Sequence, residues 1–196
     1  MGEVRKPLAE SIEYSTPWFQ LVSKRVEGEP EPYYALRMID YVCIVALTPP
    51  GDLVLVRQYR PAVNAYTLEL PAGHVEPNQT PEQAARLELA EETGFTAARF
   101  DLLGEHYSDT GRHENTAWCY LATDVTVLPG WTAREAGIEV VLAPRADLRR
   151  LMLAGEISHA PHLAAVMLAA LRDGRFREAL FPTDDAIRSP RSAGER

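Results

Sequence analysis

The sequence predicts an α/β fold in which a mixed β-sheet lies between helices. Three observations carry this prediction. Short apolar stretches with β-branched residues recur along the chain, one helical segment interrupts them after residue 80, and two helical stretches follow the last of them. Strands on both sides of one helix, closed by further helices, are typical of a sheet that is covered on its two faces.

The length and composition fit one domain that has a proper core. The chain has 196 residues, of which 46% are hydrophobic, and a net charge of −8. A negative chain is a poor partner for a nucleic-acid backbone, which favours a basic surface. A nucleotide-like substrate stays compatible, because a bound cation masks phosphate charge. The sequence shows no apolar run of membrane-spanning length and no apolar signal region, so we expect a cytoplasmic protein without a membrane partner.

The expected elements follow from apolar patterning and from turn residues. Residues 1–15 are polar, and we expect them to be loosely held. The turn Pro49-Pro50-Gly51-Asp52 should join two strands as a hairpin. The tail after Phe181 is rich in polar residues and proline, and we expect it to be disordered. The expected strands are 17–27, 41–48, 53–56, 66–70, 98–107, 114–123 and 138–142, and the closing helices are 145–154 and 160–173.

The chain contains two cysteines, and each lies in an apolar run. Cys43 is in YVCIVAL and Cys119 is in AWCYLA. Free cysteine is among the most buried residue types, so we expect two buried thiols in strands. Two cysteines do not make a disulfide framework.

Residues 73–95, GHVEPNQTPEQAARLELAEETGF, are the most informative segment. Thr80 suits an N-cap, Pro81 suits the first turn of a helix, and Gly94 is a typical C-terminal stop. The sequence therefore predicts a loop followed by a helix that ends at about residue 93.

Three carboxylates crowd the end of this expected helix. Glu88 and Glu92 are four residues apart and stack on one helix face, with Glu91 beside them. Like charges at a helix C-terminus oppose the helix dipole, and a divalent cation is the simplest group that would favour them. The alternative is a solvated acidic helix face.

The same segment resembles the signature box of Nudix hydrolases, G-x5-E-x7-R-E-U-x-E-E-x-G-U, in which U is a bulky apolar residue. Gln79 stands where the box has its first Glu, and Leu87 stands where the box has Arg. Arg86 lies one residue early, and one residue along a helix rotates a side chain by about 100°. Arg86 is therefore not expected to replace the box arginine. The positions that agree are Gly73, Glu88, Leu89, Glu91, Glu92, Gly94 and Phe95.

The resemblance extends upstream. RQYR at 57–60, followed by ELPAG at 69–73, is similar to the ADP-ribose and nucleoside-diphosphate-sugar pyrophosphatase branch. This branch implies a Nudix α/β/α sandwich over residues 41–182, after an N-terminal strand region at 1–40 that contributes to a homodimer interface, and before a tail at 183–196. It also implies Mg2+-dependent hydrolysis, with Mn2+ as an alternative ion, of a nucleoside-diphosphate sugar such as ADP-ribose.

The resemblance also implies the site residues. The metal ligands would be Glu88, Glu91, Glu92 and the carbonyl of Ala72. Glu91 and Glu92 are then also catalytic candidates. A further catalytic Glu on a later loop would be Glu135, with Glu139 as its competitor.

Three residues are candidates for substrate binding. By analogy with the branch, Arg60 would contact phosphate, and Glu69 and Arg112 would lie near the substrate. The alternative for Arg60 is an ion pair with an acid such as Glu69. His159 and His162 are spaced i, i+3 beside a helix start, which is compatible with metal binding, but the sequence offers no third ligand and capping or surface roles are the alternative.

Three functions remain open at this stage. The first is a diphosphatase that releases a nucleoside monophosphate and a sugar phosphate. The second, motivated by Gln79 and Leu87, is a low-activity or non-catalytic domain that binds a nucleotide sugar or a protein partner. The third is an isomerase or nucleotide-sanitising enzyme of the same fold, which RQYR and ELPAG favour less. The loop at 108–111, SDTG, lacks the proline that ADP-ribose pyrophosphatases tend to carry, so other sugar nucleotides stay open as substrates.

Overall fold

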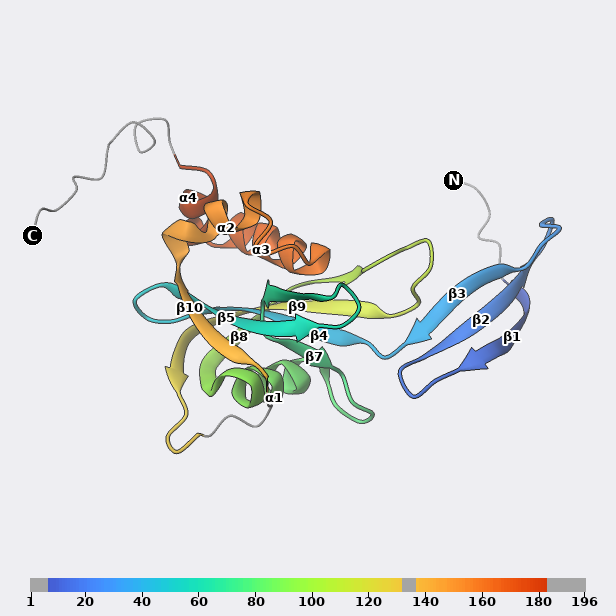
Figure 1. The fold of residues 1–196 in the computed structure, drawn as a ribbon, viewed down its shortest axis with the longest axis horizontal. Helices are drawn as coiled ribbons and strands as arrows, with labels where there is room; N and C mark the ends of the chain where they lie inside the picture. The colour runs from blue at the N-terminus through green and yellow to red at the C-terminus, as the bar shows by residue number, and fades with distance from the viewer. Residues whose placement is uncertain (1–6, 132–136, 183–196) are drawn as a thin grey trace, which may run out of the picture.

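The computed structural model describes residues 7–131 and 137–182, and its centre is a seven-stranded mixed sheet (Figure 1). The strand order is β10-β5-β4-β9-β8, with β6 paired to β5 and β7 paired to β4. The pair β4 and β9 is parallel, and the other pairs in this sheet are antiparallel. The strands are β4 (Tyr41–Leu47), β5 (Asp52–Arg60), β6 (Ala65–Glu69), β7 (Ala72–His74), β8 (Phe95–Tyr107), β9 (Thr116–Val127) and β10 (Glu139–Pro144).

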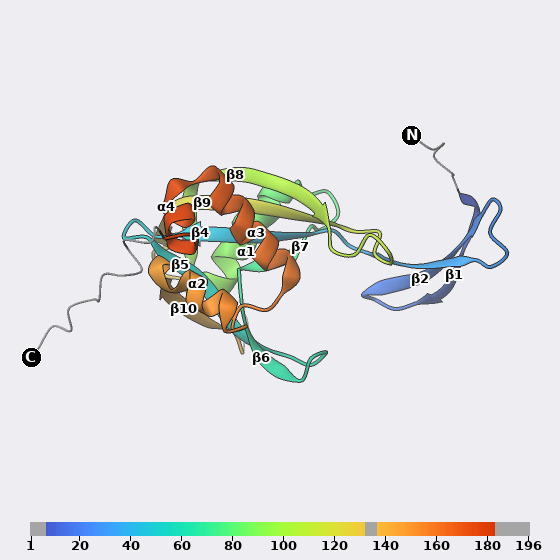
Figure 2. The same cartoon turned by 90° about the horizontal axis from the view of Figure 1, so that it is seen from above.

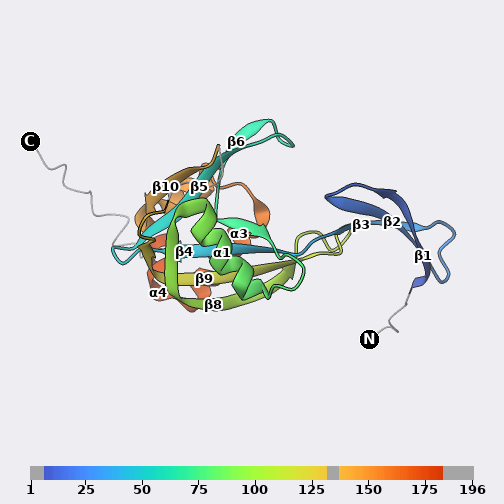
Figure 3. The ribbon, with the colours of Figure 1, turned by 90° about the horizontal axis from the view of Figure 1, so that it is seen from below.

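Helices cover both faces of this sheet. One face is covered by α1 (Pro81–Thr93), as Figure 3 shows from below, and the other face carries the remaining helices. This α/β/α arrangement confirms the fold class predicted from the sequence. The helices of the second face are α2 (Leu148–Leu153), which follows a short 3-10 turn at Arg145–Asp147, α3 (Ala160–Arg172) and α4 (Gly174–Leu180).

A small antiparallel sheet projects from one end of the molecule (Figure 2). It consists of β1 (Pro7–Ser15), β2 (Phe19–Val26) and β3 (Tyr33–Met38). The expectation that residues 1–15 are loosely held is wrong for β1, because this strand pairs with β2 from Pro7 to Ser15. Every residue of β1 is exposed, so its sequence lacks the apolar alternation that reveals a half-buried strand.

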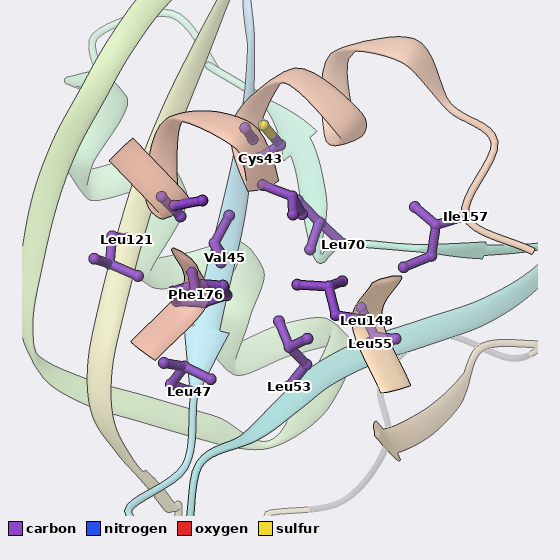
Figure 4. Close-up of a cluster of buried hydrophobic side chains, with 14 of the residues drawn as sticks. Cys43, Val45, Leu47, Leu53, Leu55, Leu70, Leu121, Leu148, Ile157 and Phe176 are labelled. Atoms are coloured by element: carbon purple, nitrogen blue, oxygen red, sulfur yellow. The ribbon is translucent and has the colours of Figure 1, made fainter. Parts of the chain in front are cut away.

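The core has one layer on each face of the central sheet. Along β4, Cys43, Val45 and Leu47 point toward the helices of the second face, where they pack with residues such as Phe176 and Leu148 (Figure 4). The alternate β4 residues Val42, Ile44 and Ala46 pack instead with Ala84, Ala85 and Leu89 of α1. Because a strand places successive side chains on opposite faces, β4 is buried on both sides, as its continuous apolar run predicts.

The caps of α1 set the position of its carboxylates. Thr80 accepts a hydrogen bond from the Gln83 N–H, and the Gln83 side chain accepts one from the Thr80 N–H, which completes a capping box. Gly94 ends the helix at φ 72°, in the left-handed region that favours glycine. The helix boundaries predicted from Thr80, Pro81 and Gly94 are therefore confirmed. Within the described ranges, every helix is too short or too polar to span a membrane.

Candidate functional site

Several of the predicted site residues gather around a pocket of about 400 Å³. The pocket lies where the ends of β5, β6 and β7 meet the last turns of α1 and the beginning of α3. Five residues predicted from the sequence line it, namely Arg60, Glu69, Ala72, Glu88 and Glu92. They come from four different elements, so the fold brings together groups that are far apart along the chain.

Glu88 and Glu92 reach the pocket from α1. They lie one helical turn apart on the same face, and Glu92 is buried. Oε2 of Glu92 accepts a hydrogen bond from the backbone N–H of Ala72 at 3.0 Å. This bond ties the last turn of α1 to β7.

Gly73 allows β7 to lie against this face of α1. A Cβ atom placed on residue 73 would overlap the carboxyl group of Glu88. The residue therefore acts as a close-approach glycine, and any larger side chain would displace the Glu88 carboxyl group or the strand.

The donors on this side of the pocket suit a divalent cation. Two carboxylates, those of Glu88 and Glu92, line the pocket together with Ala72, whose backbone carbonyl is the third oxygen donor that the resemblance implies. Hard cations such as Mg2+ and Mn2+ prefer oxygen ligands and keep positions for water and phosphate. The residues present therefore fit the ion that the box resemblance implies.

Arg60 and Glu69 form a two-point ion pair in the same pocket. Arg60 Nε lies 2.9 Å from Glu69 Oε1, and Arg60 Nη2 lies 2.7 Å from Glu69 Oε2. Thr67 donates a further bond of 2.6 Å to Oε1. Both residues line the pocket, and the Arg60 side chain is 44% exposed whereas that of Glu69 is only 6% exposed. The ion pair with Glu69 therefore occurs, and the contact of Arg60 with phosphate stays a prediction.

The charge of Glu69 is fixed by its partners. Burial alone would raise the pKa of this carboxyl, but the hydrogen bonds from Arg60 and Thr67 outweigh burial and lower the pKa to about 2. Glu69 is therefore an anion over the whole physiological range, and Arg60 keeps a fixed position.

His162 supports the same corner from α3. Its Nδ1 accepts a hydrogen bond from the backbone N–H of Leu70 at 3.2 Å. Burial, together with the nearby charge of His159, lowers the pKa of His162 to about 3, so the ring is neutral. Since Nδ1 is an acceptor, the single ring proton sits on Nε2. That nitrogen is buried and has no hydrogen-bond partner among the described residues.

His159, His162 and Glu69 place potential metal-ligand atoms within 4.8 Å of one another. Glu69 is thus the third ligand that the sequence spacing did not offer. The hydrogen bonds argue against a metal here. Both carboxylate oxygens of Glu69 already accept hydrogen bonds from Arg60. A cation on Nδ1 of His162 would displace the Leu70 N–H, and a cation on Nε2 would move the ring proton to Nδ1, where it would face the Leu70 N–H. Within this group, His162 supports the backbone at Leu70, and His159 packs edge-on against the His162 ring.

Four of the predicted residues either do not line the pocket or lie outside the residues that the structure describes. Glu91 is half-buried on α1 and is not part of the pocket lining. Arg112 stacks over the Tyr33 ring, with its guanidinium carbon 4.9 Å from the ring centre, and does not line the pocket either. Glu139 pairs with Arg57 at 3.3 Å on the exposed edge of β10, and Glu135 lies outside the described residues. The roles assigned to Glu91, Arg112 and Glu135 stay predictions.

The two departures from the box also have structural consequences. Gln79 Oε1 accepts a bond from the Glu76 N–H and so closes the loop before α1. Arg86 pairs with Glu82 and stacks on Phe100, away from the pocket, which agrees with the expectation that it does not replace the box arginine. Leu87 is 42% exposed.

Sequence reasoning missed the two histidines as pocket residues. Both His159 and His162 line the pocket, although capping or surface roles were the favoured alternative. The i, i+3 spacing at a helix start was the available signal, but their partner Glu69 lies about ninety residues earlier along the chain. Only the packing of α3 against the end of β6 brings them together.

Comparisons with known proteins bear on this site. A family model described as NUDIX domain matches residues 38–165. The chain is 28% identical over 134 residues to the ADP-ribose pyrophosphatase of Bacillus subtilis, covering 67% of this chain and 72% of that protein. It is 31% identical over 129 residues to the ADP-ribose pyrophosphatase of Mycobacterium tuberculosis, covering 64% and 62% respectively. A crystal structure of an ADP compounds hydrolase has the same fold, with a TM-score of 0.74 over 87% of this chain and 94% of the other at 20% identity.

Proposed function

We propose that this chain, which belongs to the Nudix family, hydrolyses the diphosphate linkage of a nucleoside-diphosphate sugar such as ADP-ribose. The family and the Nudix hydrolase class predicted from the sequence are confirmed by the match over residues 38–165 and by the relatives. The relatives support hydrolysis of nucleoside diphosphate compounds in general. The products of the proposed reaction are a nucleoside monophosphate and a sugar phosphate.

The observation that carries the proposal is the pairing of two chemical surfaces in one pocket. Glu88 and Glu92 offer negative charge, and Arg60, paired with Glu69, offers positive charge in the same pocket. A diphosphate with a divalent cation is complementary to both surfaces, because the cation binds to carboxylates and the phosphate oxygens bind to a guanidinium.

The chain's own residues have separate tasks in this proposal. Glu88, Glu92 and the Ala72 carbonyl hold Mg2+, or Mn2+ in its place. When bound, the cation stabilises charge on the phosphate oxygens and lowers the pKa of the attacking water. Arg60 orients the diphosphate through its planar guanidinium. The anionic Glu69 already holds that guanidinium, so substrate binding costs little conformational entropy of the Arg60 side chain.

The N-terminal sheet supports a homodimer as part of this proposal. Its region exposes several large apolar side chains, and Trp18 is 73% exposed. An interface with a second copy would remove these side chains from water. Light scattering in solution should give about twice the chain mass of 21.8 kDa. A mass equal to one chain would contradict the dimer. The other exposed apolar residues of this region are Leu8, Ile12, Tyr14, Phe19, Tyr33 and Tyr34.

A panel of diphosphates tests the proposed substrate class. Purified protein with Mg2+, or separately with Mn2+, is given ADP-ribose, ADP-glucose, GDP-mannose, ADP and 8-oxo-dGTP, and products are separated by chromatography. We expect at least one sugar nucleotide to be split to a nucleoside monophosphate and a sugar phosphate faster than ADP or 8-oxo-dGTP. Preference for a free nucleotide, or no hydrolysis above the metal-free control, would contradict the proposal.

A further inference from the structure

The two cysteines face each other across neighbouring strands of the central sheet. Cys43 of β4 and Cys119 of β9 are register partners in the parallel pair, and their Sγ atoms are 3.2 Å apart. Both are free thiols, and both are buried in the core layer that α3 covers (Figure 4 labels Cys43). The fold therefore holds two sulfurs in contact within a rigid core, where neither needs to diffuse to meet the other.

The two thiols are not equivalent. The Cys43 S–H donates to Cys119 Sγ, and this bond lowers the pKa of Cys119. The thiolate is the reactive form of cysteine, so Cys119 is the better nucleophile of the two.

Access also favours Cys119. A cavity of about 190 Å³ is lined by Cys119 and by residues of β8, β9 and the start of α3, whereas Cys43 does not line it. A water molecule occupies about 30 Å³ of liquid volume, so the cavity has room for a molecule as small as hydrogen peroxide. A bulky disulfide reagent would not fit.

We propose that Cys43 and Cys119 form a peroxide-sensitive dithiol that closes to an intrachain disulfide. The Cys119 sulfur attacks hydrogen peroxide, the O–O bond breaks, and a sulfenic acid and one water are formed. The Cys43 sulfur then attacks the sulfenic sulfur, an S–S bond forms, and the hydroxyl leaves with the Cys43 proton as a second water. Two thiols lose two electrons in total, and one peroxide is reduced to two waters.

The backbone geometry permits this bond. Neighbouring strands in a sheet lie about 4.8 Å apart, and disulfides join Cα atoms that are about 4.4 to 6.8 Å apart. The sulfurs must approach by about 1 Å to reach the bonded distance of about 2.05 Å. Small side-chain rotations on two register partners supply that movement.

The disulfide would also act on the pocket. Cys43 is the register partner of Ala72 on β7 at the other edge of β4, and the Ala72 N–H donates to Glu92. The disulfide would join β9 to β4, and β4 is the strand that pairs with β7 beside the pocket. We expect hydrolysis to slow on oxidation, an effect that rests on the proposed function.

Intact mass and thiol titration test the bond itself. Reduced protein is treated with hydrogen peroxide, quenched with an alkylating agent in denaturant, digested and mapped. Wild type should lose both alkylatable thiols, yield a Cys43–Cys119 cross-linked peptide, and recover both thiols with dithiothreitol. Retention of both thiols, or sulfinic acid at Cys119 without a cross-link, would overturn the proposal. This test uses the wild-type protein and needs no variant.

Two variants assign the roles. Cys43→Ala should accumulate a sulfenic acid at Cys119 that a dimedone probe traps, and Cys119→Ala should leave Cys43 reduced. A Cys43 that reacts as fast in Cys119→Ala as in wild type would contradict the assigned order. In the activity assay, oxidised wild type should turn over at least threefold more slowly, with recovery in dithiothreitol. An unchanged rate beside a mapped disulfide would refute the coupling to β7, and an inactive reduced protein would instead count against the proposed function.

Discussion

Gly73 of β7 lies against the carboxyl group of Glu88 on α1, with no room for a side chain between them. This approach places the β7 backbone beside the helix face that carries both pocket carboxylates, and the Ala72 N–H reaches Glu92 for the same reason. The glycine and the first carboxylate of the acidic cluster are fifteen residues apart in sequence and act as one structural unit.

Replacing Gly73 with alanine should therefore impair the site more than the fold. The added methyl group displaces Glu88 or β7, and a displacement of about 1 Å at a reacting centre can lower a rate about 100-fold. We expect Gly73→Ala to lower kcat/KM by at least tenfold in the diphosphate assay. Gly174→Ala is the matched control, because a Cβ there meets nothing within 4 Å and should leave the rate unchanged. Equal activity of both variants would show that the close approach does not matter.

Arg60 should be sensitive even to lysine. Its two hydrogen bonds to Glu69 require the planar fork, which lysine lacks. A lost charge-assisted bond corresponds to about 1.5 to 3 kcal/mol, so we expect Arg60→Lys to lower kcat/KM by about 10- to 100-fold. Arg57→Lys is the control on the same strand, since Arg57 pairs with the exposed Glu139 away from the pocket. A comparable loss in both variants would contradict a specific role for Arg60.

His162 should contribute to stability through the bond to Leu70. In His162→Leu the Leu70 N–H is left buried without its acceptor, which costs about 1 to 3 kcal/mol. Asparagine can place an acceptor near the position of Nδ1, so His162→Asn should retain part of that stability. Urea denaturation at neutral pH measures both. Equal stability of His162→Leu and wild type would show that the bond contributes nothing.

The same residue should make stability depend on pH. The pKa of His162 is about 3 in the folded protein, against 6.5 ordinarily, so as pH falls below about 6.5 the unfolded chain takes up a proton that the folded chain does not. The free energy of unfolding should then fall by up to about 1.4 kcal/mol per pH unit toward pH 4.5, below which Glu69 also begins to contribute. His162→Asn lacks this group and should show a shallower decline between pH 6.5 and 4.5. Parallel declines would contradict the buried neutral histidine.

Leu87 offers a gain-of-function test. It occupies the box position at which the family has arginine, it is 42% exposed, and a leucine neither donates hydrogen bonds nor balances charge. We expect Leu87→Arg to raise kcat several-fold, because a guanidinium beside Glu88 can orient that carboxylate. Leu87→Lys supplies charge without the planar fork and should help less. An unchanged or lower kcat in Leu87→Arg would mean that the site compensates by another route or no longer accommodates arginine.

Local sequence patterns were sufficient to predict most of the fold and some of the site residues. Thr80, Pro81 and Gly94 determine α1 through contacts within a few residues, and the apolar run of β4 reflects burial on both faces. The strand β1 was not predicted, because all of its residues are exposed and its sequence therefore has no apolar alternation. The support of Leu70 by His162 depends on tertiary packing across ninety-two residues, which no local pattern encodes.

The proposed diphosphate hydrolysis depends on the carboxylates of α1 that line the pocket. The most direct test compares the rate of ADP-ribose hydrolysis with Mg2+ in wild type, Glu92→Gln and Glu82→Gln. Glu92 lines the pocket, whereas Glu82 on the same helix pairs with Arg86 away from it, so the two variants remove the same charge from α1 at different places. We predict a loss of at least about 100-fold for Glu92→Gln, the scale of a removed catalytic group, and a rate within about twofold of wild type for Glu82→Gln. A Glu92→Gln protein that is folded and as active as wild type would show that hydrolysis does not depend on this carboxylate.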